Sequence, residues 1–80
     1  MENKSLMLGG RYRHFKGKEY TVLNIVTHSE TGEKMVLYRA EYGDNTIYVR
    51  PYDMFMSKVD KEKYPEVEQE YRFEWISNPS

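Results

Sequence analysis

The hydrophobic residues between positions 20 and 50 fall into three short runs, which predict three β-strands. The first run, residues 20–28, is rich in β-branched side chains and contains no glycine or proline. Its apolar residues occupy both even and odd positions, which predicts burial on both faces or a β-bulge near Leu23 and Asn24. The second and third strands are expected over residues 35–42 and 46–50.

Turn residues separate these strands and set their antiparallel order. Gly32 can adopt a positive φ in the turn after the first run. The sequence Gly43-Asp44-Asn45 is suited to a tight hairpin loop between the second and third strands. Upstream, residues 11–17 are expected to form a short first strand that turns at Gly17 and Lys18.

The pattern changes at Pro51, which cannot donate a hydrogen bond to a β-ladder. Residues 51–56 are expected to form a single helical turn in which Met54 or Phe55 plugs the core. The polar stretch 58–70 predicts a loop, with an edge strand as the alternative. A last strand is expected to return to the sheet, with alternation at Val67, Tyr71, Phe73 and Trp75 and with Arg72 and Glu74 facing water.

These elements predict a mostly-β fold: a small SH3-like half-open barrel of about five to six short antiparallel strands with one short 3₁₀ or α turn. An OB-like barrel is the alternative, although no proper helix is evident for it. We expect one domain over residues 10–76, a flexible N-terminal arm over residues 1–9 and a polar tail over residues 77–80.

Composition narrows the class of protein. The 80-residue chain has a formal net charge of −1, whereas a dedicated nucleic-acid binder usually carries a basic excess. It contains no cysteine, so there is no disulfide framework and no thiolate zinc site. No apolar run is long enough for a signal peptide or a bilayer span. We expect a cytoplasmic monomer that binds no membrane and no cofactor.

Every arginine lies within two residues of a tyrosine, and tyrosine and arginine together suit either a binding face or a rigid small barrel. The first hypothesis for function is recognition of a protein or peptide through Tyr38, Tyr48 and Tyr52 with Arg39. Arg50, just before the helical turn, is expected to hold that turn in place. A structural ion-pair network of Arg39 and Arg50 with Glu41 and Asp53 is the competing interpretation.

The segment 11–18 is the best candidate for contact with RNA or single-stranded DNA. It interleaves aromatic rings with cations, and bases stack on such rings while cations follow the phosphates. The residues concerned are Arg13, His14, Phe15 and Lys16. A charged edge strand that resists unwanted pairing is the structural alternative.

A third hypothesis is a small-molecule sensor or an enzyme that uses His14, His28 and Glu30. The spacing of these residues matches no metal motif, and histidines on separate segments more often cap turns. No serine lies in the strained, glycine-flanked turn that exposes a nucleophile. We therefore expect a binding module rather than an enzyme.

Several blocks of the chain resemble a known family. They are Tyr12 to Gly17 with Tyr20, residues 28–31, residues 36–43, Val49-Arg50-Pro51 followed by Met54-Phe55, and Arg72-Phe73-Glu74. In this order they resemble the bacterial family of unknown function DUF1653, over roughly residues 10–76. Tyr48 and Tyr52 depart from its pattern, which has tryptophan and leucine there. The resemblance implies a small bacterial β-rich domain, and it transfers no catalytic residues because the family has no established activity.

Overall fold

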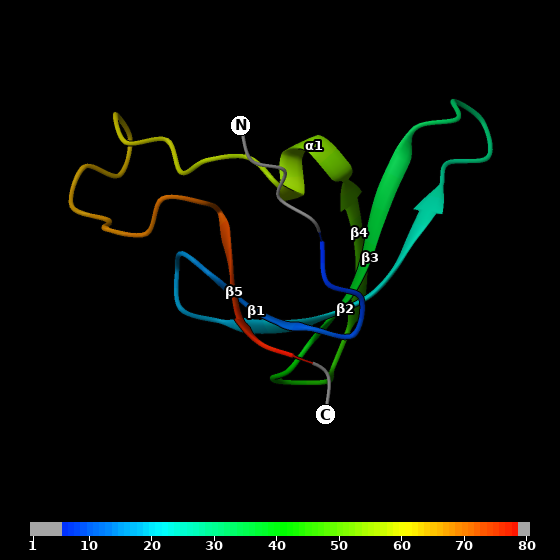
Figure 1. Ribbon diagram of the computed structural model, residues 1–80, viewed down its shortest axis with the longest axis horizontal. Coiled ribbons are helices and arrows are strands. Elements are labelled where there is room, and N and C mark those ends of the chain that lie inside the picture. The colour runs from blue at the N-terminus through cyan, green and yellow to red at the C-terminus, as the bar shows by residue number, and fades with distance from the viewer. Residues whose placement is uncertain (1–5, 79–80) are drawn as a thin grey trace.

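The computed structural model describes residues 6–78 and shows one antiparallel sheet of five strands with a single short helix (Figure 1). The sheet order is β4-β3-β2-β1-β5, so β4 and β5 are its edges, and the sheet does not close into a barrel. The elements are β1 (Arg11–His14), β2 (Glu19–Thr27), β3 (Lys34–Ala40), β4 (Ile47–Pro51), α1 (Tyr52–Phe55) and β5 (Phe73–Ser77). The predicted mostly-β fold and its helical turn are confirmed.

The two central hairpins follow the turn chemistry of the sequence. The register between β2 and β3 shifts between Val22 and Asn24, which confirms the predicted bulge. The loop between β3 and β4 places Gly43 at φ 59° and Asn45 at φ 57°, in the left-handed region that glycine and asparagine tolerate best. The Asn45 side chain also donates to the Ala40 carbonyl at 2.9 Å, which closes this turn.

The core is an aromatic cluster on one face of the sheet. Phe55, the last residue of α1, is 1% exposed and stacks on Phe73 with ring centroids 4.0 Å apart. The Tyr12 and Tyr38 rings pack edge-to-face with the Phe55 ring, with centroids 5.9 and 5.3 Å from its centroid. Phe55 is therefore the residue that plugs the core, whereas Met54 is 46% exposed.

The last strand begins later than predicted, and two of its expected orientations are wrong. Trp75 shares the alternation of Phe73 but is 50% exposed, because α1 covers the Phe73 ring and no described aromatic ring packs on Trp75. Arg72 is half-buried rather than directed to water. It precedes β5, where its N–H donates to the Ser57 carbonyl at 2.9 Å.

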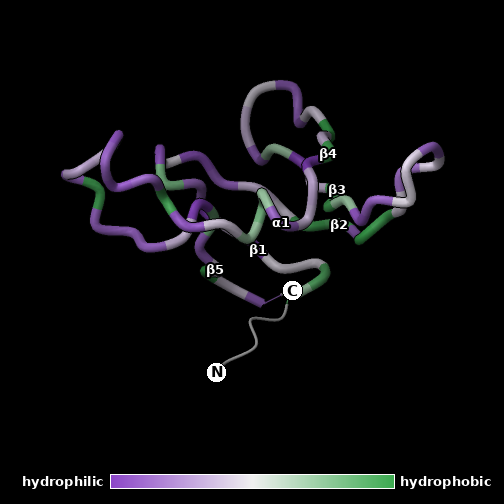
Figure 2. Tube along the Cα trace, turned by 90° about the horizontal axis from the view of Figure 1, so that it is seen from above, coloured by the Kyte–Doolittle hydropathy of each residue, from purple (hydrophilic) through white to green (hydrophobic). Residues whose placement is uncertain are grey.

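The segment between α1 and β5 is a long loop that is mostly hydrophilic (Figure 2). It lies on the side of the molecule away from the β2–β3 hairpin (Figure 1). An isolated antiparallel pair between Lys58 and Tyr71 joins its two ends. Val59 is 5% exposed and donates its N–H to the Glu70 carbonyl. The loop is therefore anchored at its base, and this anchoring positions the candidate site.

Residues 1–5 of the predicted arm and residues 79–80 of the predicted tail lie outside the described residues. Within the arm, Leu6 packs against the core cluster and the Gly9 N–H donates to the Val22 carbonyl at 2.7 Å. Strand β5 extends to Ser77. No helix in residues 6–78 is long and apolar enough to cross a membrane.

Candidate functional site

A basic pocket opens where the long loop meets the β1–β2 turn. The Phe15 N–H donates to the Arg72 carbonyl at 2.9 Å, and this bond holds the end of β1 against the end of the loop. The cavity has a volume of about 340 Å³. Its lining residues come from four chain segments: His14, Phe15, Lys16, Arg50, Asp60, Lys63, Tyr64 and Arg72.

Four cations converge on this pocket against one carboxylate. Lys16, Arg50, Lys63 and Arg72 belong to the β1–β2 turn, the end of β4 and the two sides of the loop. Within residues 6–78, none of the four forms an ion pair. The carboxylate, Asp60, accepts the backbone N–H of Glu62 at 3.1 Å and so caps its own turn. The pocket therefore keeps an excess of positive charge.

The protein orients the two arginines without neutralising them. The Nε of Arg50 donates to the hydroxyl of Tyr38 at 3.1 Å, and its guanidinium lies 5.6 Å from the Phe73 ring centroid. The Nε of Arg72 donates to the Ser57 hydroxyl at 3.2 Å. Neutral partners fix each guanidinium plane but leave its charge, which is the condition for gripping a carboxylate or a phosphate.

Aromatic rings also line the pocket. The Phe15 and Tyr64 rings are tilted against each other with centroids 4.9 Å apart, and His14 stacks on Phe15 at 4.5 Å. The Lys16 ammonium lies 5.5 Å from the Tyr64 centroid, and the Lys63 ammonium lies 5.6 Å from it. These ring contacts hold both lysines near the cavity through cation–π attraction.

The pKa of His14 reflects its burial and the positive charge of the pocket. Burial, and to a smaller extent the nearby charges of Arg50, Arg72 and Lys16, lower its pKa from 6.5 to about 4. The His14 Nδ1 also accepts the Lys16 N–H at 3.1 Å, which requires an unprotonated nitrogen. His14 is therefore neutral at physiological pH, because a further positive charge beside the four cations is disfavoured.

This shift predicts a pH-dependent loss of stability. Unfolded His14 takes up its proton near pH 6.5 and folded His14 only near pH 4, so folding stability falls as the pH drops through that window and is unaffected above it. After a discount for solvent screening of the half-buried ring, we expect a loss of about 1 kcal/mol. In urea unfolding, the stability deficit of His14→Gln should shrink by that amount between about pH 7.5 and pH 4.5. An equal change for His28→Gln would contradict this assignment.

The predicted binding residues divide between the two faces of the sheet. His14, Phe15, Lys16 and Arg50 line the basic pocket, so three of the four residues named in the basic segment meet the arginine before the helical turn at one site. Arg50 contacts Tyr38 and Phe73 rather than an acid, and no ion pair to Asp53 forms in the described chain. The expected four-residue ion-pair network is therefore not assembled.

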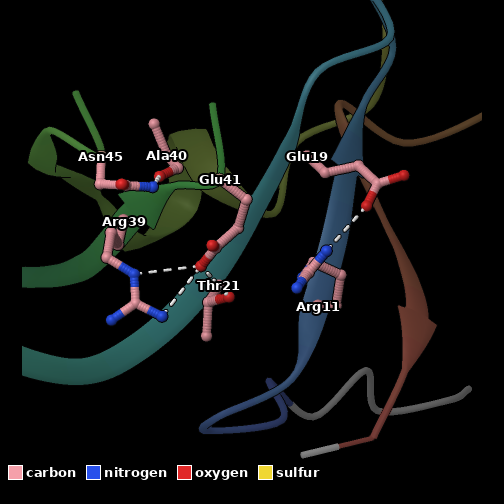
Figure 3. A network of polar contacts seen from close by, with 7 residues as sticks. All are labelled: Arg11, Glu19, Thr21, Arg39, Ala40, Glu41 and Asn45. Carbon is pink, nitrogen blue, oxygen red and sulfur yellow. Dashed lines mark hydrogen bonds and ion pairs between the residues drawn. The ribbon is translucent and has the colours of Figure 1, made fainter. Parts of the chain in front are cut away.

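The predicted tyrosine–arginine face of β3 does not form either. Tyr38 is 4% exposed, because it points into the core, and its neighbour Arg39 points to the opposite face, as adjacent strand residues must. Arg39 donates from Nε and Nη2 to one carboxylate oxygen of Glu41 at 3.0 and 2.9 Å, and Thr21 donates to the same oxygen (Figure 3). The Thr21 bond and the Arg39 charge lower the pKa of Glu41.

The remaining predicted residues lie apart from the pocket. Tyr48 is 42% exposed on edge strand β4, and its ring is tilted against Tyr38 at 5.7 Å. Tyr52 is half-buried beneath the Lys34 ammonium, which lies 4.2 Å from its ring centroid. Arg13 is half-buried on β1, where its Nε is shielded from solvent and has no hydrogen-bond partner in the described chain.

The structure does not bring His14, His28 and Glu30 together. The whole of β2 separates His14, at the end of β1, from His28, after the far end of β2. His28 uses Nδ1 to accept the N–H of Glu30 at 3.1 Å, so it caps the β2–β3 turn. Among residues 6–78, no group of three histidine, cysteine or acidic side chains is arranged to hold a metal ion.

Sequence reasoning missed half of the pocket. Asp60, Lys63 and Tyr64 lie in a stretch whose alternating charges are typical of a solvated loop. Arg72 was assigned to the outer side of a strand that in fact begins one residue later. The usable signal was the pairing of tyrosine with cations at Lys63-Tyr64 and Tyr71-Arg72, which repeats the pattern of the basic segment.

Comparison with known proteins places these observations in a family. The model of the family described as "Protein of unknown function (DUF1653)" matches residues 10–75. The crystal structure of a DUF1653 protein from Bordetella bronchiseptica is similar, with a TM-score of 0.73 and 26% sequence identity. The alignment covers 89% of this chain and 88% of that chain. No curated protein matches the sequence.

Proposed function

Because the chain belongs to the DUF1653 family of proteins of unknown function, we propose its role from the pocket alone: a non-catalytic binding module that holds an anionic group of a protein or peptide partner. The observation that carries this proposal is the convergence of Lys16, Arg50, Lys63 and Arg72, none of them ion-paired in residues 6–78, on one cavity. Arginine clusters of this kind recognise phosphorylated and acidic side chains through charge-assisted hydrogen bonds.

The size of the cavity supports a single anionic group rather than an extended strand. Its volume of about 340 Å³ is near the lower end for ligand pockets. Beyond it, Arg11 and Arg39 are already paired with Glu19 and Glu41, so these cations do not continue the basic surface (Figure 3). With a net charge of −1, the domain has no excess of cations with which to follow a phosphate backbone.

RNA or single-stranded DNA is the second candidate, and the wall formed by Phe15 and Tyr64 favours it. Both rings are only half-buried, and Lys16 lies close to both. An unstacked base on such a ring with its phosphate at the arginines would combine stacking with charge neutralisation.

Titration separates the two candidates. Binding of three matched peptides, carrying phosphoserine, glutamate or serine at one position, should be followed by amide NMR shifts, with short labelled RNA and DNA compared by anisotropy at low and physiological salt. We expect the phosphoserine or glutamate peptide to shift Lys16 and Arg72 while the serine peptide does not. Salt-sensitive RNA or DNA binding tighter than either charged peptide would establish the second candidate instead. Absence of any anion-dependent shift would refute both.

A further inference from the structure

We propose that the β4 edge of the sheet pairs with a second copy of this chain, so that the two β4 strands join antiparallel into one continuous sheet. The backbone groups that form this contact belong to Ile47 and Val49, which do not line the basic pocket, so the proposal goes beyond the anionic site. It also departs from the monomer expected from the sequence. The backbone of β4, its exposed side chains and its charge each support it.

The outward-pointing backbone groups of β4 belong to Ile47 and Val49. The Ala40 N–H donates to the Thr46 carbonyl at 2.9 Å, which extends the β3–β4 register by one pair. In an antiparallel ladder, pairs that exchange hydrogen bonds alternate with pairs that do not. Tyr48 therefore bonds to β3, whereas the N–H and C=O groups of Ile47 and Val49 point away from it. Because β4 is the outer strand, no other strand lies beside these groups in residues 6–78.

Two further observations agree with this alternation. Pro51, two residues after Val49, has no N–H, and at this position the β3–β4 ladder requires none. The Glu41 N–H donates to the Glu19 carbonyl at 3.0 Å, so at this end of β3 the odd-numbered residues bond to β2. The even-numbered residues are left to bond to β4.

Strand β4 lacks most of the features that protect an edge strand from pairing. Ile47 and Val49 are each 54% exposed, Tyr48 is 42% exposed, and residues 45–49 carry no charge. The β3–β4 register contains no bulge. Charged side chains, bulges and covering elements are the usual protections. The other edge strand, β5, carries the exposed charge of Glu74, so β4 is the edge open to pairing.

A second copy fits this edge because the edge is complementary to itself. When Ile47 lies opposite Val49 of the second copy, every N–H and C=O group of these two residues is bonded in both copies. Tyr48 then faces Tyr48 of the second copy at the two-fold axis. An aromatic pair of this kind stabilises neighbouring strands.

The charges at the two ends of β4 are also complementary. Antiparallel pairing sets the β3–β4 turn of one copy beside the end of β4 in the other. The turn carries Asp44 and the end carries Arg50, so opposite charges lie at the same end of the paired strands. Neither residue forms an ion pair in residues 6–78. Two copies therefore meet without like charges at the contact.

The length of β4 sets the strength of the dimer. The strand has five residues, whereas a standard interface uses roughly 20–30 residues on each side. We therefore expect a weak dimer that dissociates in the micromolar to millimolar range. Sedimentation equilibrium over that range of protein concentrations should show a mass that rises from monomer to dimer.

A matched pair of lysine variants tests which surface forms the dimer. Val49→Lys places the two introduced charges diagonally across the paired strands on one face, and it should weaken dimerisation at least about tenfold. Leu8→Lys makes the same change in charge at a residue that is 46% exposed in the turn beside β2, and it should dimerise like the native protein. Circular dichroism verifies that both variants are folded. A monomer mass at every concentration would refute the proposal, as would equal dimerisation of the two variants.

Amide hydrogen exchange measured by NMR tests the backbone contact without any substitution. Exchange at the N–H groups of Ile47 and Val49 should slow as the protein concentration rises. The Tyr48 N–H, which bonds to β3, should exchange slowly even in the monomer. Dimerisation that leaves Ile47 and Val49 unprotected would assign the contact to another surface and refute pairing through β4.

Discussion

Replacing Phe55 with alanine is expected to remove a large part of the protein's folding stability. Phe55 is 1% exposed, stacks on Phe73 at 4.0 Å and meets the rings of Tyr12 and Tyr38 edge-on. Truncating a buried phenylalanine to alanine costs about 3–5 kcal/mol, from lost transfer energy and from the cavity left behind. A domain of this size has a total stability on the order of 4–12 kcal/mol, and small cores lie at the low end.

The neighbouring residue provides the control. Met54 belongs to the same helical turn but is 46% exposed, so Met54→Ala should change the unfolding free energy by less than about 0.5 kcal/mol. Circular dichroism during urea unfolding measures both variants, and Phe55→Leu should fall between them because it keeps most of the apolar volume. If Phe55→Ala unfolds at the same urea concentration as Met54→Ala, packing of Phe55 in the core does not contribute the expected stability.

The contrast between these two residues shows where sequence reasoning succeeds and where it stops. The hairpins were predictable because glycine and asparagine mark left-handed turns, as at Gly43 and Asn45. The helical turn was predictable because Pro51 ends the ladder. The choice between Met54 and Phe55 stayed open, because a single turn is too short to show a helical period.

The faces of the strands were less predictable than their positions. Tyr38 and Arg39 were grouped as one binding patch because they are adjacent, yet adjacent strand residues point to opposite faces. The buried tyrosine then holds Arg50 through its hydroxyl, while Arg39 pairs locally with Glu41. The same residue types thus play two roles, and only the register of β3 against its neighbours decides between them.

The basic pocket could not be predicted because its parts are distant in sequence. A backbone hydrogen bond joins Phe15 and Arg72, and no local sequence pattern predicts it. Lys63 lies in a loop whose charges are typical of a solvated surface, and Arg50 directly precedes a helical turn that the sequence predicts it to hold. A cluster of this kind becomes visible only when the long-range pairing is known.

Removing two cations from the basic pocket is expected to abolish detectable anion binding. The double variant Lys63→Gln with Arg72→Gln removes two charged hydrogen-bond donors from the pocket lining. A hydrogen bond to a charged group contributes about 1.5–3 kcal/mol, so losing two of them should weaken binding at least about 150-fold. Isothermal titration of the phosphoserine peptide measures this loss, and circular dichroism verifies that the variant is folded.

A second double variant separates a local site from the general charge of the protein. Arg11→Gln with Arg39→Gln makes the same change in net charge, but these two arginines are paired with Glu19 and Glu41 outside the pocket (Figure 3). The Arg11–Glu19 pair is largely exposed and the Arg39–Glu41 pair is partly exposed, so each contributes about 1 kcal/mol or less. This protein should therefore remain folded and bind the peptide within about twofold of the native affinity. Equal losses in the two double variants would mean that the anion responds to net charge alone. If the Lys63 and Arg72 variant still binds the peptide, the anionic group is held at a site other than the basic pocket.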